Sequence, residues 1–319
     1  MSEAFTELPS LLAFLELEPR QLDLMLDDST GFGLRVPQGF AAQMRKGDPA
    51  DPLLLQVLPS AQEQLAVPGF APDPVGDLQA QAVPGILHKY HGRALIMATG
   101  ACAVHCRYCF RRHYPYTDGI AAPRRWQAIL EYLQADRSIR EVILSGGDPL
   151  LVSDTRLAEW IRQLADIQHL QRLRLHTRLP VVLPQRVTSE LLELLCESDL
   201  SPVVVLHVNH PNELSQPVLE AIASLKGTGA LLLNQSVLLR RVNDSAEVLA
   251  SLSERLFASG VLPYYLHLLD RVQGAAHFEV VESHALELYR LLLTSLPGYM
   301  VPKLVREMAG RASKTPMSG

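Results

Sequence analysis

The chain has 319 residues, of which 48% are hydrophobic and 20% are charged, enough for one large barrel-sized domain or about two ordinary ones. These proportions exclude a short disulfide scaffold, a fibre and a disordered tail. Lysine and arginine number 29 against 34 aspartate and glutamate residues, which gives a net charge of −5. Basic residues occur in runs no longer than pairs, so nucleic acid is not the expected partner.

The N-terminus, MSEAFTELPS, lacks a basic region followed by an apolar one, and the longest apolar runs have the length of strands. We therefore expect neither a signal peptide nor a membrane-spanning helix. The expected location is the cytoplasm, with no membrane partner.

Residues 1–87 contain many short proline-rich breaks and one helical pattern, LLAFLELEPRQLDLML at 11–26. This predicts an N-terminal, mostly helical segment that wraps on the main body. Residues 88–300 alternate apolar runs with amphipathic segments of helical length, which indicates βαβ units and a parallel sheet. The expected strands are RALIMAT, EVILSGG, RLRLHTR, PVVVLHV, ALLLNQSVL and LPYYLHLLD, and the expected helices lie at 123–135, 155–166, 189–197, 213–225, 246–259 and 279–296.

Six such units predict an α/β fold, an incomplete (β/α)6 barrel, followed by a short C-terminal segment at residues 301–319. Polar residues follow each expected strand. In a parallel barrel the reactive site lies at the C-terminal ends of the strands, so these residues should converge. They are the cysteine loop, Gly146-Gly147-Asp148, Arg178, Asn209-His210, Asn234-Gln235 and Asp270.

Three of the four cysteines, Cys102, Cys106 and Cys109, lie in ATGACAVHCRYCFRRHYP with the spacing C-x3-C-x2-C. Three thiolates on one tight loop can bind three irons of a [4Fe-4S] cluster and leave the fourth iron open for a substrate or cofactor. A zinc site completed by His105 or His113 is the alternative. The fourth cysteine, Cys196, falls in the apolar helical pattern ELLELLCESD and is predicted to be a buried core residue.

The C-x3-C-x2-C loop after the first strand, with an aromatic residue before its last cysteine, resembles that of the radical S-adenosylmethionine (SAM) enzymes. In that superfamily the amino and carboxylate groups of SAM bind the open iron. An electron from the cluster then cleaves SAM to a 5′-deoxyadenosyl radical. The resemblance assigns SAM binding to the turn after the second strand, Gly146, Gly147 and Asp148.

Several longer strings are similar to the lysine 2,3-aminomutase family within that superfamily: LSGGDPLLVSD, LPVVLPQRVT, VNHPNEL, LLNQSVLLRRVND and the terminal SKTP. The resemblance runs from about residue 88 to 316 and implies a second cofactor, pyridoxal 5′-phosphate (PLP). It implies covalent attachment of PLP to Lys314, with Lys89 and Arg93 at its phosphate and Asn234 and Gln235 as neutral donors. Judged without the family, a lysine so near the end of the chain would be solvated.

The same resemblance implies an isomerase that acts on L-lysine. It assigns the substrate carboxylate to Arg111, whose guanidinium suits a planar carboxylate, and the distal ammonium to Asp270 and Glu307. Asp270 favours a diamino acid over glutamate, because a second carboxylate there would meet like charge. Without the resemblance, Asp270 would be a turn acid and Glu307 a solvated acid paired with Arg306.

Two positions depart from the catabolic members of the family, which carry aspartate at the position of Glu307 and a zinc-binding cysteine near that of Ser245. A structural zinc is therefore not expected. The short form, with serine before Lys314, resembles the branch whose (R)-β-lysine is passed to a lysyl ligase and attached to elongation factor P. A reductant such as flavodoxin or ferredoxin is also implied. The alternatives are a general metabolic aminomutase for lysine or another amino acid, and a non-catalytic iron–sulfur or zinc regulatory protein.

Overall fold

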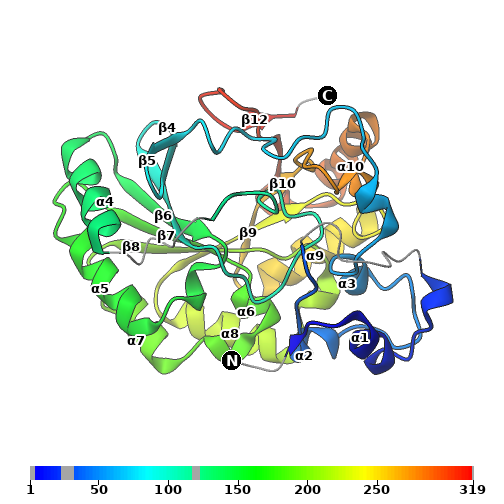
Figure 1. The fold of residues 1–319 in the computed structure, drawn as a ribbon. Helices are drawn as coiled ribbons and strands as arrows, with labels where there is room; N and C mark the ends of the chain where they lie inside the picture. The colour runs from blue at the N-terminus through cyan, green and yellow to red at the C-terminus, as the bar shows by residue number, and fades with distance from the viewer. Residues whose placement is uncertain (1–3, 23–31, 117–122, 318–319) are drawn as a thin grey trace.

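The computed structural model describes residues 4–22, 32–116 and 123–317. Within these residues, ten strands form one sheet in the order β12-β11-β10-β9-β8-β7-β6-β5-β4-β3 (Figure 1). Their bounds are β3 Gln81–Val83, β4 Ile86–Tyr90, β5 Arg93–Thr99, β6 Glu141–Gly146, β7 Arg172–Thr177, β8 Ser201–Leu206, β9 Leu231–Val237, β10 Leu262–His267, β11 Lys303–Arg306 and β12 Thr315–Pro316.

The strands from β5 to β11 pair in parallel in chain order, while β3, β4 and β12 pair antiparallel with their neighbours. Among the described strands, the two edges β3 and β12 do not pair with each other, so the barrel is open. The incomplete α/β barrel and its six expected strands are thus confirmed. The expected boundary between residues 87 and 88 falls inside β4, and the C-terminal segment adds β11 as a further parallel strand.

Helices connect the parallel strands, and Figure 1 shows α4, α5 and α7 along the outside of the sheet. They are α4 Pro123–Ala135, α5 Asp154–Ala165, α6 Leu179–Val182, α7 Ser189–Cys196, α8 Gln216–Gly227, α9 Ala246–Ala258 and α10 Glu282–Ser295. All the expected helices of the barrel are found within a few residues of their predicted bounds. The four-residue α6 was not predicted, because it is too short to show a helical period.

Hydroxyl side chains begin three of these helices. The side-chain oxygens of Ser153, Thr188 and Ser245 each accept a hydrogen bond from a backbone N–H in the first turn of α5, α7 and α9. Such caps satisfy amides that have no partner within the helix. Ser245 therefore has a structural use of its own in this chain, as the cap of α9.

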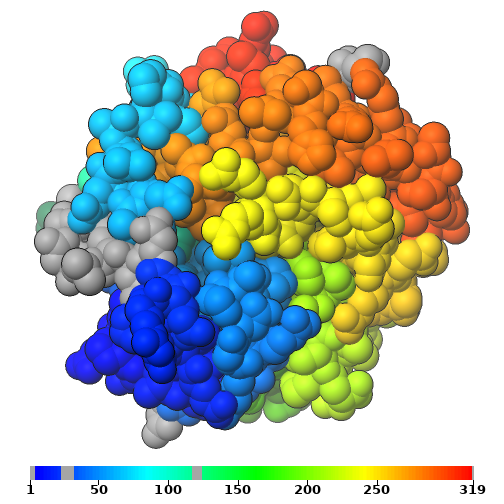
Figure 2. Space-filling model, turned by 90° about the vertical axis from the view of Figure 1, so that its right-hand side faces the viewer, coloured from blue at the N-terminus to red at the C-terminus, as the bar shows by residue number. Residues whose placement is uncertain are grey.

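The N-terminal segment contains β1 Ala4–Phe5, paired antiparallel with β2 Val36–Pro37, and the short helices α1 Leu8–Phe14, α2 Gln38–Ala41 and α3 Pro52–Leu55. Figure 2 shows its blue residues packed against one face of the barrel. The helix expected at residues 11–26 is found only up to Phe14. The 3-10 turn Pro19–Gln21 follows, and residues 23–26 lie outside the described residues.

The largest apolar cluster fills the space between the sheet and its helices and extends into the N-terminal segment. Trp160, fully buried on α5, stacks on Trp126 of α4 with ring centroids 4.8 Å apart. Cys196 is exposed, so the prediction that it is a core residue is wrong: α7 buries Leu191 and Leu195, and the next residue points away from that face. None of the helices in the described ranges is long and apolar enough to cross a membrane.

Candidate active site

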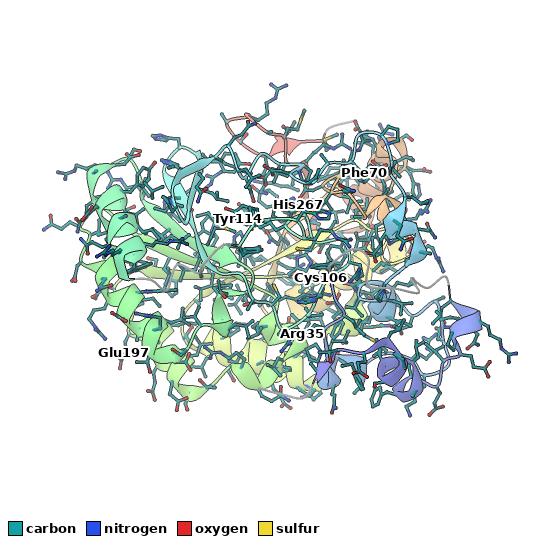
Figure 3. The ribbon with its side chains drawn as sticks, viewed as in Figure 1. Arg35, Phe70, Cys106, Tyr114, Glu197 and His267 are labelled. Carbon is teal, nitrogen blue, oxygen red and sulfur yellow. The ribbon has the colours of Figure 1, made fainter. Side chains whose placement is uncertain are left out.

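The cysteine loop follows β5 and is held in place from two sides. On one side, the backbone N–H groups of His105 and Arg107 donate to the carbonyls of Arg35 and Gln56 in the N-terminal segment, each at 2.9 Å. Figure 3 shows Cys106 near the centre of the molecule, whereas Glu197 lies at the periphery. The loop is therefore fixed inside the open barrel rather than left on the surface.

On the other side, the loop contacts the two glycines that end β6. The N–H of Gly147 donates to the carbonyl of Thr99 at 2.6 Å, and Gly146 has a φ of +108°, where glycine is favoured. A Cβ on Gly147 would lie only 2.1 Å from the carbonyl oxygen of Ala101. The Gly-Gly sequence thus permits backbone contact with the loop that carries Cys102.

Asp148, the third member of that turn, uses its carboxylate inside the protein. It is buried and accepts hydrogen bonds from the Thr177 hydroxyl at 2.7 Å and from the backbone N–H groups of Leu150, Arg178 and Leu179 at 2.8 to 3.1 Å. Its side chain therefore joins the ends of β6 and β7. The carboxylate of Asp148, a predicted SAM-binding residue, is thus occupied within the protein.

A buried polar network lies behind the cysteines. The Arg178 guanidinium donates to the Cys106 sulfur at 2.7 Å, to the Tyr108 hydroxyl at 2.8 Å and to Glu213 at 2.9 Å. Gln56, from the N-terminal segment, accepts a further hydrogen bond from Arg178 at 2.6 Å. The sequence places Arg178 at a strand end, but nothing in the sequence pattern shows that its partner would be a cysteine.

The three thiols fit an iron–sulfur cluster better than a single ion. Across the described ranges, no three His, Cys, Asp or Glu side chains converge on one metal position. A cubane instead binds each thiolate to a different iron, so its ligands stand farther apart. Burial raises the pKa of the Cys102 thiol, and the neighbouring thiols raise it further. The same two causes raise the pKa of Cys109 to about 11. Three thiolates there need cationic compensation, which the irons of a cluster supply.

A second group of functional residues forms a chain of alternating charges. Lys314 lies one residue before β12, and its ammonium donates to Glu307 at 2.6 Å. The other oxygen of Glu307 accepts from Lys89 on β4 at 3.0 Å. Lys89 also pairs with Asp77 at 2.5 Å, and Asp77 in turn pairs with the Arg111 guanidinium at 2.6 Å. Residues 218 positions apart, such as Lys89 and Glu307, thus meet in one largely buried site.

Glu307 and a nearby acid, Asp270, differ in their pKa values. Burial raises the pKa of Glu307, but Lys314 and Lys89 outweigh burial and bring it to about 2. For Asp270, which follows β10, burial and next the charge of Glu307 raise the pKa to about 7. One Asp270 oxygen is buried without a hydrogen-bond partner among the described residues. A buried acceptor of this kind suits a cationic donor from a bound molecule.

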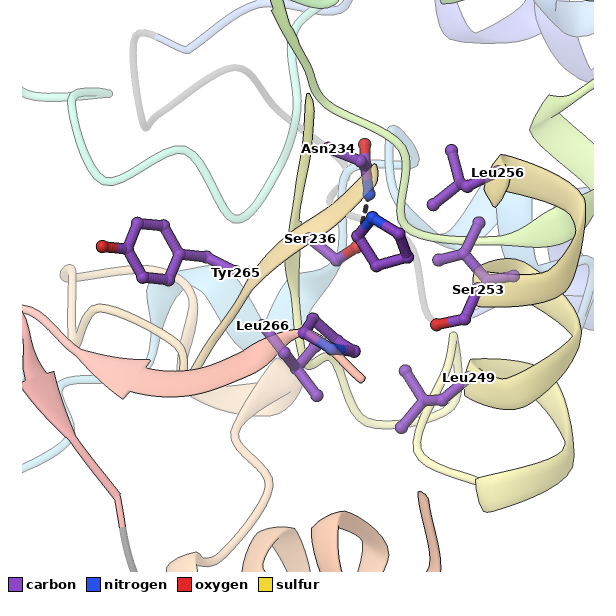
Figure 4. Close-up of a pocket in the computed structure, with 10 residues that line it drawn as sticks. Asn234, Ser236, Leu249, Ser253, Leu256, Tyr265 and Leu266 are labelled. Carbon is purple, nitrogen blue, oxygen red and sulfur yellow. Dashed lines mark hydrogen bonds between the residues drawn. The ribbon is translucent and has the colours of Figure 1, made fainter. Parts of the chain in front are cut away.

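The remaining predicted residues divide between the two faces of the sheet. The Arg93 guanidinium stacks on the Tyr90 ring at 4.7 Å and, among the described residues, has no salt bridge. Asn234 instead faces α9, in the small pocket of Figure 4, and its carboxamide bonds the backbone of Val208. Gln235, the next residue on β9, points to the opposite face and is aligned with Tyr265. Arg93, Gln235 and Lys314 therefore all lie near Tyr265, whereas Asn234 lies on the other face of the sheet.

Lys89 lies in the site, but its ammonium is engaged within the protein: it donates to Glu307 and to the carbonyl of Val75, and it forms an ion pair with Asp77. Two neutral histidines near Lys314, which the sequence did not reveal as site residues, also belong to this site. Burial lowers the pKa of His176 on β7 and of His267 on β10, and Lys314 lowers it further. The sequence predicted the two strands that carry these histidines, but a histidine within a strand does not by itself indicate a functional site.

The open parallel barrel and its cysteine loop define a radical SAM enzyme. In agreement, the sequence profile of the Radical SAM superfamily matches residues 96–245. That superfamily implies a [4Fe-4S] cluster and SAM as cofactors, and the fixed loop with three available thiols fits both.

The similarity to individual proteins is more specific. The chain is 50% identical to the L-lysine 2,3-aminomutase of Haemophilus influenzae over 99% of this chain and 93% of that protein. It is 52% identical to the L-lysine 2,3-aminomutase of Escherichia coli over 90% of this chain and 83% of that protein. With that of Clostridium subterminale it shares 38% identity over 85% of this chain and 65% of that protein. The chain belongs to the lysine 2,3-aminomutase family, and it is a radical SAM isomerase.

Proposed function

We propose that this chain is a PLP-dependent lysine 2,3-aminomutase that converts L-α-lysine into (R)-β-lysine. The observation that carries the proposal is the position of Lys314. Its amine lies in a largely buried ionic site with Arg111 and two acids, although it is only a few residues from the end of the chain. When bound, the cluster with SAM supplies a carbon radical that abstracts hydrogen, and PLP carries the amino group that migrates.

The charges of the site match the ends of L-lysine. Arg111 offers its two terminal nitrogens to the α-carboxylate, and Asp270 offers its unpartnered oxygen to the distal ammonium. Arg93, which has no ion pair among the described residues, is the better candidate for the PLP phosphate. Lys89 is already held by two acids.

Glu307 has a role at two stages of this scheme. It pairs with the Lys314 ammonium at 2.6 Å. Once the Lys314 nitrogen is covalently engaged, it no longer offers that ammonium to Glu307. The distal ammonium of L-lysine can then take its place, because Glu307 is ionised at neutral pH. Glu307 would therefore balance a positive charge both in the protein without PLP and when L-lysine is bound.

Borohydride trapping tests the attachment of PLP. Anaerobically prepared protein is incubated with PLP, reduced with borohydride and digested, and the peptide that carries the adduct is identified by mass spectrometry. We expect the adduct on Lys314, with its loss in Lys314→Ala. Lys303→Ala is the matched control, because Lys303 is an exposed lysine of the same C-terminal segment. Protein that gives no adduct, or one that survives in Lys314→Ala, contradicts the proposal.

The substrate is tested by turnover with SAM and a reductant, flavodoxin or ferredoxin being the physiological class. L-Lysine, ornithine and arginine are compared in parallel. We expect β-lysine from L-lysine, because Asp270 and Glu307 supply acids for the distal ammonium of a diamino acid. Preferred turnover of another amino acid would replace lysine in the proposal.

We also propose that the product serves the modification of elongation factor P. Glu307, in place of aspartate, and Ser313, before Lys314, support this branch of the family over the catabolic one. In the test, the enzymatic product, purified elongation factor P and its lysyl ligase are added to the cytoplasmic extract of a strain that lacks this gene. Attachment of one β-lysyl group supports the role. A ligase that attaches α-lysine equally well under the same conditions leaves general lysine metabolism as the function.

A further inference from the structure

Asp77 lies in a short loop that the sequence did not single out. The carboxylate of Asp73 accepts from the backbone N–H groups of Asp77 at 2.9 Å and Leu78 at 3.0 Å. Gly76, between them, has a φ of +68°, where glycine is favoured. The loop is therefore a defined turn, and it directs the 2%-exposed Asp77 inward between Lys89 and Arg111.

Arg111 is fixed by two contacts that leave one edge of its guanidinium available. Its Nε donates to the Asp77 carboxylate at 2.6 Å, and its guanidinium carbon lies over the Phe110 ring, 4.5 Å from the centroid. Among the described residues, the two terminal nitrogens of Arg111 have no hydrogen-bond acceptor. These two nitrogens form the planar fork that binds a carboxylate with two parallel hydrogen bonds.

Without an acid at Nε, this fork would have no fixed direction. An arginine side chain has several rotatable bonds, and a single ring contact restrains the plane but not the rotation within it. A carboxylate at Nε fixes that rotation. Because Asp77 also contacts Lys89, it sets the separation of the two cations as well.

We propose that Asp77 is a positioning residue for substrate selection: it orients Arg111 so that its two terminal nitrogens donate to the α-carboxylate of the amino acid. The inference rests on the proposed role of Arg111 at that carboxylate. Asp77 itself does not contact the substrate. Loss of Asp77 should therefore weaken the binding only of ligands that carry a carboxylate.

The rival interpretation is that Asp77 only neutralises buried charge. In that case its loss would weaken the whole site and affect every ligand alike. A pair of ligands that differ only in the carboxylate separates the two interpretations. L-Lysine and L-lysinamide share both amino groups, and only L-lysine can occupy the Arg111 fork.

The experiment uses the PLP-loaded enzyme without SAM, so that no turnover occurs, and follows the absorbance of bound PLP as each ligand is added. In Asp77→Asn we expect the Kd of L-lysine to rise roughly tenfold to a hundredfold, the effect of losing a charge-assisted hydrogen bond. The Kd of L-lysinamide should stay within about twofold of the wild-type value. Equal weakening of both ligands, or no change for either, overturns the proposal.

A second variant and the wild-type titration cover the cases in which Asp77→Asn gives no answer. If Asp77→Asn does not fold, the same ligand pair is compared in Asp77→Glu, which keeps the charge and moves the carboxylate by one methylene. A rise in the ratio of the two Kd values supports the proposal, and an unchanged ratio overturns it. If the wild-type enzyme itself gives no absorbance change with L-lysine, the proposed function fails instead, and the two failures are distinguished.

Discussion

The raised pKa of Asp270 predicts a pH dependence for substrate capture. Asp270 is buried beside Glu307, and its pKa lies at about 7 instead of its usual value near 3.8. Only the ionised form attracts the distal ammonium of lysine. As the pH falls below 7, each unit leaves about one tenth as much ionised Asp270. We therefore expect kcat/KM for L-lysine to fall about tenfold per pH unit, or about 1.4 kcal/mol.

The assay measures initial rates with the reconstituted enzyme between about pH 5.5 and pH 8.5 at saturating SAM. Glu307→Gln removes the neighbouring negative charge that raises the Asp270 pKa, so its inflection should move to lower pH. Asp270→Asn should give a low kcat/KM that lacks this inflection. A flat wild-type profile, or an inflection that persists in Asp270→Asn, would refute the reasoning.

Three further predictions concern the framework. Gly147→Ala should sharply lower iron and sulfide content with little change in far-UV circular dichroism, because its Cβ would strike the Ala101 carbonyl; normal iron content would contradict this. Trp160→Ala should lower the free energy of unfolding by about 3–5 kcal/mol in denaturant titration, since the ring is fully buried. Cys196→Ser should keep both iron and activity, because Cys196 is exposed, whereas Cys102→Ser should lose both.

The barrel was predictable because its signals repeat. The strands from β5 to β10 have six or seven residues each and alternate with helices, and three of those helices begin with a hydroxyl cap, so these local features agree with one another. The strand β11 was missed because KLVR has only four residues and no helix separates it from β12. Cys196 was misplaced because a leucine-rich helix does not reveal from composition alone which of its positions point outward.

The candidate site could be predicted only in part, for reasons that lie in strand geometry and in loops. Asn234 and Gln235 are adjacent on β9, and adjacent strand residues face opposite sides, so no single site on one face of the sheet can use both. That constraint was available from the sequence. Asp77 was not, because an acid in a proline- and glycine-rich turn has no periodicity, and its partners are distant in sequence.

The position of Lys314 shows how the sheet converts a tail residue into a site residue. β12 pairs antiparallel with β11, and the Met317 N–H donates to the Leu304 carbonyl at 2.9 Å. β11 continues the parallel sheet beside β10, the strand that precedes Asp270. The hairpin therefore returns Lys314 to the same end of the barrel as Asp270 and directs its amine to Glu307. Proximity to the chain end does not imply mobility when the last residues complete the sheet that carries the site.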